Sequence, residues 1–168
     1  MGKSDSLILN NDSVNKKLLR ITHQINEGYH REKEIYLVGI RENGYSLAKI
    51  IASNLSSLKV PFTIKLIELI IDKKKPLSST TQISPDKSLT DKNIILIDDV
   101  LNSGRTLMHA ASYIMNHNIK KMNTIVLVDR RHRSFPIKAD WVGLTLSTTI
   151  QENIRVEFNK KEINVYLE

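Results

Sequence analysis

The chain contains no cysteine. This absence excludes disulfide bonds, thiol nucleophiles and cysteine-ligated zinc, and it agrees with a reducing cytoplasm. Uninterrupted apolar runs are short, as at residues 94–97, and none approaches the length needed to cross a bilayer. The first five residues lack the apolar stretch of a secretory signal. We therefore expect a cytoplasmic protein that has no contact with a membrane.

The composition is typical of a globular protein with an anionic partner. Of 168 residues, 40% are hydrophobic and 26% are charged, which suits one domain with a substantial core. The 25 Lys and Arg residues outnumber the 18 Asp and Glu residues, so the formal net charge is +7. This excess favours nucleic acid or phosphorylated metabolites as partners. Because we find no internal repeat and no linker between two complete cores, we expect residues 1–168 to form a single domain.

Hydrophobic periodicity predicts short buried strands that alternate with helices. Asp12 and Ser13 are expected to cap a first helix that ends at Gly28. The alternation predicts an α/β fold with a mainly parallel central sheet flanked by helices, and such sheets bind ligands at the carboxyl ends of their strands. The expected strands are residues 34–40, 62–71, 93–97, 123–128, 141–146, 154–158 and 163–167, with further helices over 47–58 and 106–116 and a hairpin turn at 159–162.

Residues 94–106 carry the most informative pattern. A buried strand leads into Asp98 and Asp99, and a short polar loop then opens a helix. The two carboxylates can accept hydrogen bonds from sugar hydroxyls or lie near a hydrated Mg²⁺. Ser103, Gly104 and Thr106 stand where backbone N–H groups and hydroxyls converge on an anion at a helix N-terminus. The alternative is that the aspartates only start a turn and cap the helix.

This string resembles the signature of type I phosphoribosyltransferases and is not a Walker loop. The resemblance implies their fold, with a small hood segment beside the sheet. It also implies that Asp98 and Asp99 are the catalytic residues that bind the ribose hydroxyls of phosphoribosyl pyrophosphate (PRPP). The 5′-phosphate would then be held by Asn102, Ser103, Gly104, Arg105 and Thr106.

Two further blocks, residues 37–49 and 127–143, resemble the PyrR family of pyrimidine operon attenuation regulators. That family combines mRNA binding with uracil phosphoribosyltransferase activity, which converts uracil and PRPP to UMP and pyrophosphate. The resemblance implies Mg²⁺ bound mainly through PRPP, with no direct protein ligand. It assigns pyrophosphate binding to Gly39, Ile40, Arg41 and Gly44, and base binding to Val128, Asp129, Arg130 and Ile137 in a hood over residues 128–137.

The same resemblance assigns an RNA surface to the first helix and to the segment after the last core strand. Residues 120–138 hold six Lys and Arg side chains against one Asp. The simpler interpretation of such a run is a solvated face. The resemblance also implies a homodimer or a larger homo-oligomer that binds pyrimidine-operon leader mRNA. The matching RNA-binding residues are Arg20, His23, Arg133 and Lys138.

One contrast with purine-using enzymes and two departures from the PyrR pattern bear on the alternative functions. Asn102 stands where purine-using enzymes carry a carboxylate base, and an amide cannot take a proton, which argues against a 6-oxopurine substrate. Glu42 adds a negative charge to the pyrophosphate loop, and residues 71–76 replace a Tyr-Arg-Asp-Asp segment with a lysine-rich one. The alternatives are a catalytically weak RNA-binding sensor of UMP or PRPP, and a phosphoribosyltransferase for another base with no RNA role.

Overall fold

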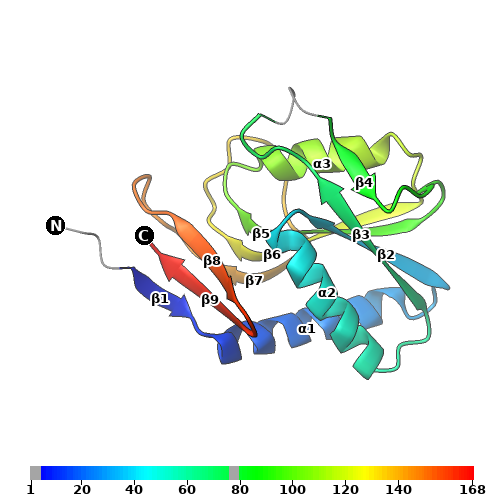
Figure 1. Cartoon of the computed structure of the whole chain (residues 1–168), viewed down its shortest axis with the longest axis horizontal. Helices are drawn as coiled ribbons and strands as arrows, with labels where there is room; N and C mark the ends of the chain where they lie inside the picture. Colours follow the sequence, from blue (N-terminus) through cyan, green and yellow to red (C-terminus); the bar gives the residue numbers. More distant parts are fainter. Residues whose placement is uncertain (1–4, 76–79) are drawn as a thin grey trace.

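The computed structural model describes residues 5–75 and 80–168, so the start of the expected signal-free N-terminus and Pro76 lie outside it. A six-stranded sheet has the order β4-β3-β2-β5-β6-β7 (Figure 1), and β4 is its one antiparallel strand among the described residues. These pairings confirm the predicted α/β fold with a mainly parallel sheet. The strands are β2 (Glu34–Ile40), β3 (Thr63–Ile70), β4 (Gln82–Ser84), β5 (Asn93–Leu101), β6 (Lys121–Asp129) and β7 (Trp141–Thr145).

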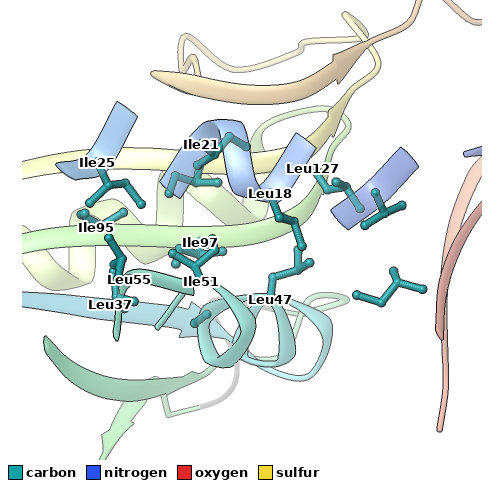
Figure 2. Close-up of a cluster of buried hydrophobic side chains, with 14 of the residues drawn as sticks. Leu18, Ile21, Ile25, Leu37, Leu47, Ile51, Leu55, Ile95, Ile97 and Leu127 are labelled. Carbon is teal, nitrogen blue, oxygen red and sulfur yellow. The ribbon is translucent and has the colours of Figure 1, made fainter. Parts of the chain in front are cut away.

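Two helices cover one face of this sheet. α1 (Asn11–Tyr29) and α2 (Asn43–Ser57) each turn an apolar stripe toward the strands. Figure 2 shows side chains from both helices meeting those of β2, β5 and β6, including Leu37, Ile95 and Leu127. Successive residues of a strand point to opposite faces, so Ile35, Leu37, Ile95, Ile97, Ile125 and Leu127 belong to this core.

The third helix, α3 (Arg105–Met115), covers the opposite face. The neighbouring even-numbered side chains of the same strands, such as Val38, Leu96 and Val126, pack in a second core with Leu107 and Ile114 of α3. Both faces of the central strands are therefore buried, which explains their continuous apolar runs. No helix of the described residues combines the length and apolarity needed to span a bilayer.

A separate three-stranded antiparallel sheet, in the order β1-β9-β8, lies beside the carboxyl end of the central sheet (Figure 1). It consists of β1 (Ser6–Leu9), β8 (Ile154–Asn159) and β9 (Glu162–Leu167). Val156, Ile163 and Val165 join the core that α1 and α2 build. The β8–β9 hairpin confirms the predicted turn, whereas β1 and β4 had no sequence prediction.

Several predicted boundaries are wrong. The side chain of Asn10, not Asp12 or Ser13, caps α1 by accepting a hydrogen bond from the Ser13 N–H, and the helix continues past Gly28 to Tyr29. The strand expected to end at residue 97 continues to Leu101 because β6 pairs with it as far as Asp129. The acidic pair therefore lies within β5 and not after it.

Candidate functional site

Asp98 and Asp99 lie where β5 loses one of its two neighbours. The registered pairing of β2 with β5 ends at Ile97, whereas β6 continues alongside. The end of the strand that β2 leaves unpaired faces a cavity. The Asp98 and Asp99 side chains are nevertheless only 4% and 13% exposed to solvent. Two carboxylates this deeply buried require partners.

Their main partner is Lys73, which follows the end of β3. Its ammonium lies 2.9 Å from Asp98 Oδ1 and 3.5 Å from Asp99 Oδ1, and its side chain is 39% exposed. The Asn43 side-chain amide at the start of α2 donates to Asp99 Oδ2 at 2.8 Å and to the Val156 carbonyl at 3.2 Å. Elements β3, α2 and β8 thus converge on the acidic pair.

This environment separates the pKa values of the two carboxyls. Burial and the charge of Asp99 raise the pKa of Asp98 to about 7, against the opposing effect of the Lys73 ammonium. Burial alone would raise the pKa of Asp99, but Lys73 and the Asn43 amide hydrogen bond lower it below its ordinary value. Burial would lower the pKa of Lys73, yet the two carboxylates raise it. Asp99, which is held in its ionised form, is therefore the main hydrogen-bond acceptor of the pair.

The loop after the acidic pair closes a cavity of about 230 Å³. Gly104 has φ of 87° and directly precedes α3, and a Cβ there would lie 2.7 Å from Ile137 Cγ2, so glycine is required. No side chain at this position caps the helix N-terminus. An N-terminus that faces a cavity in this way suits an anion. The cavity is lined by Lys73, Asp98, Asp99, Asn102, Ser103, Gly104, Arg105, Thr106 and Ile154, among others, which unites the predicted catalytic and phosphate-binding residues.

A second cavity, of about 320 Å³, lies at the predicted pyrophosphate loop. It is lined by Arg41, Glu42, Asn43, Ile71 and Lys73. Arg41 is exposed and its Nε lies 3.6 Å from Glu68 Oε1. Lys73 lines this cavity as well as the first, so the two cavities meet at its side chain.

The other residues predicted to bind pyrophosphate have packing roles. A Cβ on Gly39 would lie 2.3 Å from the Tyr45 Cα, and one on Gly44 would lie 2.4 Å from the Ile97 carbonyl oxygen. Both glycines therefore let α2 approach the strands closely. Ile40 is fully buried in the α3-side core. Contact of Gly39, Ile40 and Gly44 with pyrophosphate stays a prediction. Because the Ile40 side chain is buried, Ile40 could make such a contact only through its backbone.

Comparison with known proteins bears on these two cavities. Residues 6–160 match the model of the phosphoribosyl transferase domain family. The bifunctional protein PyrR of Clostridium kluyveri is 35% identical over 94% of this chain and 93% of its own length. PyrR of Alkaliphilus metalliredigens is 37% identical over 96% of this chain and 94% of its own.

The chain belongs to the PyrR family of phosphoribosyltransferases. Solved structures agree on the fold. The hypoxanthine phosphoribosyltransferase of Trypanosoma cruzi superposes with a TM-score of 0.78 at 13% identity, covering 96% of both chains. That of Staphylococcus aureus gives 0.72 at 17% identity, over 86% of this chain and 80% of its own.

The residues that the PyrR resemblance assigns to base binding direct their side chains into the protein interior or toward other side chains, and not into the 230 Å³ cavity. Val128 is fully buried in the core beneath α1 and α2, and Asp129 accepts from the Arg131 N–H and pairs with Arg133. The Ile137 side chain packs against the α3-side core next to Gly104. None of these side chains lines the 230 Å³ cavity. Their contact with a base stays a prediction.

Arg130, the fourth of them, is a buried junction between loops. Its guanidinium donates to Asn102 Oδ1 at 2.9 Å, to Thr148 Oγ1 at 3.0 Å and to Asn153 Oδ1 at 3.4 Å. It also donates to the carbonyls of Thr149 and Glu152. Arg130 thereby ties the loop predicted to bind phosphate to residues 148–153, and in this structure it positions Asn102.

The predicted PyrR-type RNA residues divide into two classes. Arg20 donates to the carbonyls of Val142, at 2.8 Å, and Gly143, at 3.1 Å, so its guanidinium fastens α1 to β7. Arg133 pairs with Asp129. His23 and Lys138 are exposed.

Sequence reasoning gave no individual role to three residues of the site. Lys73 was placed only within the lysine-rich segment that stands in for the PyrR family's loop over the active site, and Asn43 and Ile154 were assigned no contact with the acidic pair. Each lies far in sequence from the acidic pair and reaches it by tertiary folding. The one available signal was the position of Asn43 and Lys73 just beyond the carboxyl ends of β2 and β3.

Proposed function

We propose that this protein is a PRPP-dependent uracil phosphoribosyltransferase of the PyrR type, acting as one domain. The observation that carries the proposal is the joining, in one cavity, of a buried acidic pair and a helix N-terminus whose cap residue, Gly104, has no side chain. Asp98 and Asp99 would accept hydrogen bonds from the ribose hydroxyls of PRPP. The 5′-phosphate would lie against Ser103 and Thr106, and pyrophosphate would occupy the neighbouring cavity at Arg41.

The reaction needs positioning more than covalent chemistry from the protein. The C1–O bond to pyrophosphate breaks, the bond from uracil N1 to C1 forms, and the N1 proton is released. Because the transition state carries positive charge at C1 and the ribose ring oxygen, carboxylates held beneath the ribose stabilise it. Asn102 cannot act as a base, so the nucleobase must lose a proton readily, as uracil does more easily than a simple amide.

The residues present fit Mg²⁺ as a partner of the substrate. Among the described residues no group of three or more His, Cys, Asp or Glu side chains could hold a metal ion on its own. Asp98 and Asp99 offer carboxylate oxygens next to the cavity that would take pyrophosphate, which suits an octahedral ion that keeps phosphate and water ligands. When bound, Mg²⁺ would neutralise charge on the leaving pyrophosphate.

A pyrophosphate-release assay with PRPP, Mg²⁺ and a panel of bases tests this function. We expect release with uracil well above release with hypoxanthine, guanine or orotate. The Asp98→Asn/Asp99→Asn double variant should lose PRPP binding in calorimetry. Release with hypoxanthine alone would establish a phosphoribosyltransferase for another base. PRPP binding without release for any base would establish a sensor in place of an enzyme.

We also propose that the protein binds pyrimidine-operon leader RNA, as a homodimer or larger homo-oligomer. The bifunctional relatives and the exposed His23 and Lys138 favour this second function. Wild-type protein should bind leader RNA more tightly with UMP present at fixed salt. Equal affinity with and without UMP would contradict the regulatory function but would not affect the proposed transferase activity.

A further inference from the structure

Lys73 stands at the boundary of two cavities that the proposed function assigns to different parts of one substrate. Its ammonium lies 2.9 Å from Asp98 and 3.5 Å from Asp99, on the carboxylates that would receive the ribose hydroxyls. The same side chain lines the cavity at Arg41 that would receive pyrophosphate. A ribose bound to the acidic pair and a lysine bound to it compete for the same oxygens.

The second cavity needs a cation that it does not otherwise hold. Of its charged lining residues besides Lys73, Arg41 is paired with Glu68, and Glu42 is negative. Without Lys73 these side chains give no net positive charge for a polyanion. An ammonium on a flexible stem can reach either cavity, because it binds as a point charge and demands no fixed orientation.

The local backbone suits a side chain that moves while its main chain stays in place. Asp72 Oδ1 accepts from the N–H groups of Lys74, at 2.8 Å, and Lys75, at 3.1 Å, which closes a turn around Lys73. The Lys73 side chain is more than one-third exposed, whereas Asp98 beneath it is almost fully buried. Rotation of the lysine side chain alone can therefore break the two ion pairs.

We propose that Lys73 exchanges partners during binding: it neutralises Asp98 and Asp99 in the empty site and moves to pyrophosphate when ribose hydroxyls take the acidic pair. This inference rests on the proposed function. It makes Lys73 a competitor at the ribose subsite and a ligand at the pyrophosphate subsite. Its removal must then affect the two halves of the substrate in opposite directions.

Calorimetry with ribose 5-phosphate and with pyrophosphate, as separate ligands, tests the exchange. Lys73→Met should bind ribose 5-phosphate roughly three- to tenfold more tightly and pyrophosphate more weakly by a similar factor, the size expected for one charged contact. Lys74→Met is the matched control, since it removes the same charge one residue away. It should leave both affinities within about twofold of wild type.

A second measurement uses the wild-type chain. Acylation of the Lys73 amine by an activated ester, followed residue by residue with mass spectrometry, should accelerate when ribose 5-phosphate is added, because the ligand releases the amine from the carboxylates. Weakening of both ligands in Lys73→Met, or an unchanged acylation rate, would overturn the exchange. Wild-type protein that binds neither ligand would instead overturn the proposed function.

Discussion

Asp98 holds a carboxyl group whose surroundings favour its neutral form. Its pKa is raised from 3.8 to about 7, first by burial and then by Asp99. Between these two pH values the folded protein keeps a proton that the unfolded chain has lost, so the free energy of unfolding should fall as pH rises through this window and level off above it. Asp99, whose pKa is lowered, acts in the opposite sense only at lower pH, where its stabilising contribution is lost.

Replacing Asp98 with Asn should flatten this dependence. We expect the unfolding free energy of Asp98→Asn to fall less than that of wild type between about pH 4 and about pH 7, by on the order of 3 kcal/mol. Urea unfolding across that range measures it. The exposed Asp86→Asn is the control and should follow the wild-type curve. Parallel curves for Asp98→Asn and wild type would show that Asp98 titrates normally.

Arg131 occupies a backbone conformation that favours glycine. Its φ is 58°, in the left-handed region. A non-glycine residue in the left-handed region loses about 1–2 kcal/mol of stability. Replacement by glycine removes this loss, but glycine loses more backbone entropy on folding, which offsets about half of the gain. Arg131→Gly should therefore raise the unfolding free energy by about 0.5–1 kcal/mol in urea titrations. Arg131→Ala removes the same exposed side chain but keeps the Cβ, and a similar gain there would refute the backbone explanation.

At the scale of elements, hydrophobic periodicity predicted the strands and helices that bury apolar side chains. It did not predict the strand segments that form only because a neighbouring strand pairs with them. The central strands and three helices carry continuous or regularly spaced apolar residues, so their positions could be predicted from sequence. The end of β5 could not, because Asp98 and Asp99 are polar and stay in the strand only through pairing with β6. β1 and β4 are short, and each owes its conformation to one partner strand.

The site shows the same division. The place of the acidic pair, and of the loop predicted to bind phosphate, could be read from the sequence because the two are contiguous and stand at the end of a buried strand. The contacts of Asn43 and Lys73 with the acidic pair could not be read from the sequence, because their distance from Asp99 in space is set by the parallel order of β2, β3 and β5. The assignment of Arg130 to the base came from resemblance alone and carried no information on its loop partners.

The loop junction at Arg130 should be essential to the geometry of this end of the sheet. Arg130→Lys keeps the charge but loses the planar fork that reaches Asn102, Thr148 and Asn153 together. We expect a loss of about 2–3 kcal/mol in unfolding free energy, because buried acceptors are left unpaired. Hydrogen exchange should also quicken in residues 148–153. The neighbouring exposed Arg131→Lys is the control; a comparable loss there would remove the argument for the junction.

At the scale of the whole molecule, fewer of the basic side chains behind the net charge of +7 are free to contact an anionic partner than the sequence suggests. Within residues 120–138, Lys120 pairs with Glu32, Arg133 pairs with Asp129, and the Arg130 guanidinium is buried among loop acceptors. Arg131 and Lys138 are exposed and form no ion pair within the described residues. The proposed RNA surface should therefore depend on a few cations and not on the whole run.

This distribution predicts unequal effects on RNA binding. Each phosphate contact releases about one counterion, so losing one lowers the slope of log affinity against log salt by about 1. Lys138→Ala should produce that change, whereas Arg133→Ala should produce less, since its guanidinium already neutralises Asp129. Filter binding of leader RNA over a range of salt concentrations measures both slopes. Equal slopes for the two variants would mean that the Arg133–Asp129 pair opens on RNA, and that charge pairing in the free protein does not determine which cations bind.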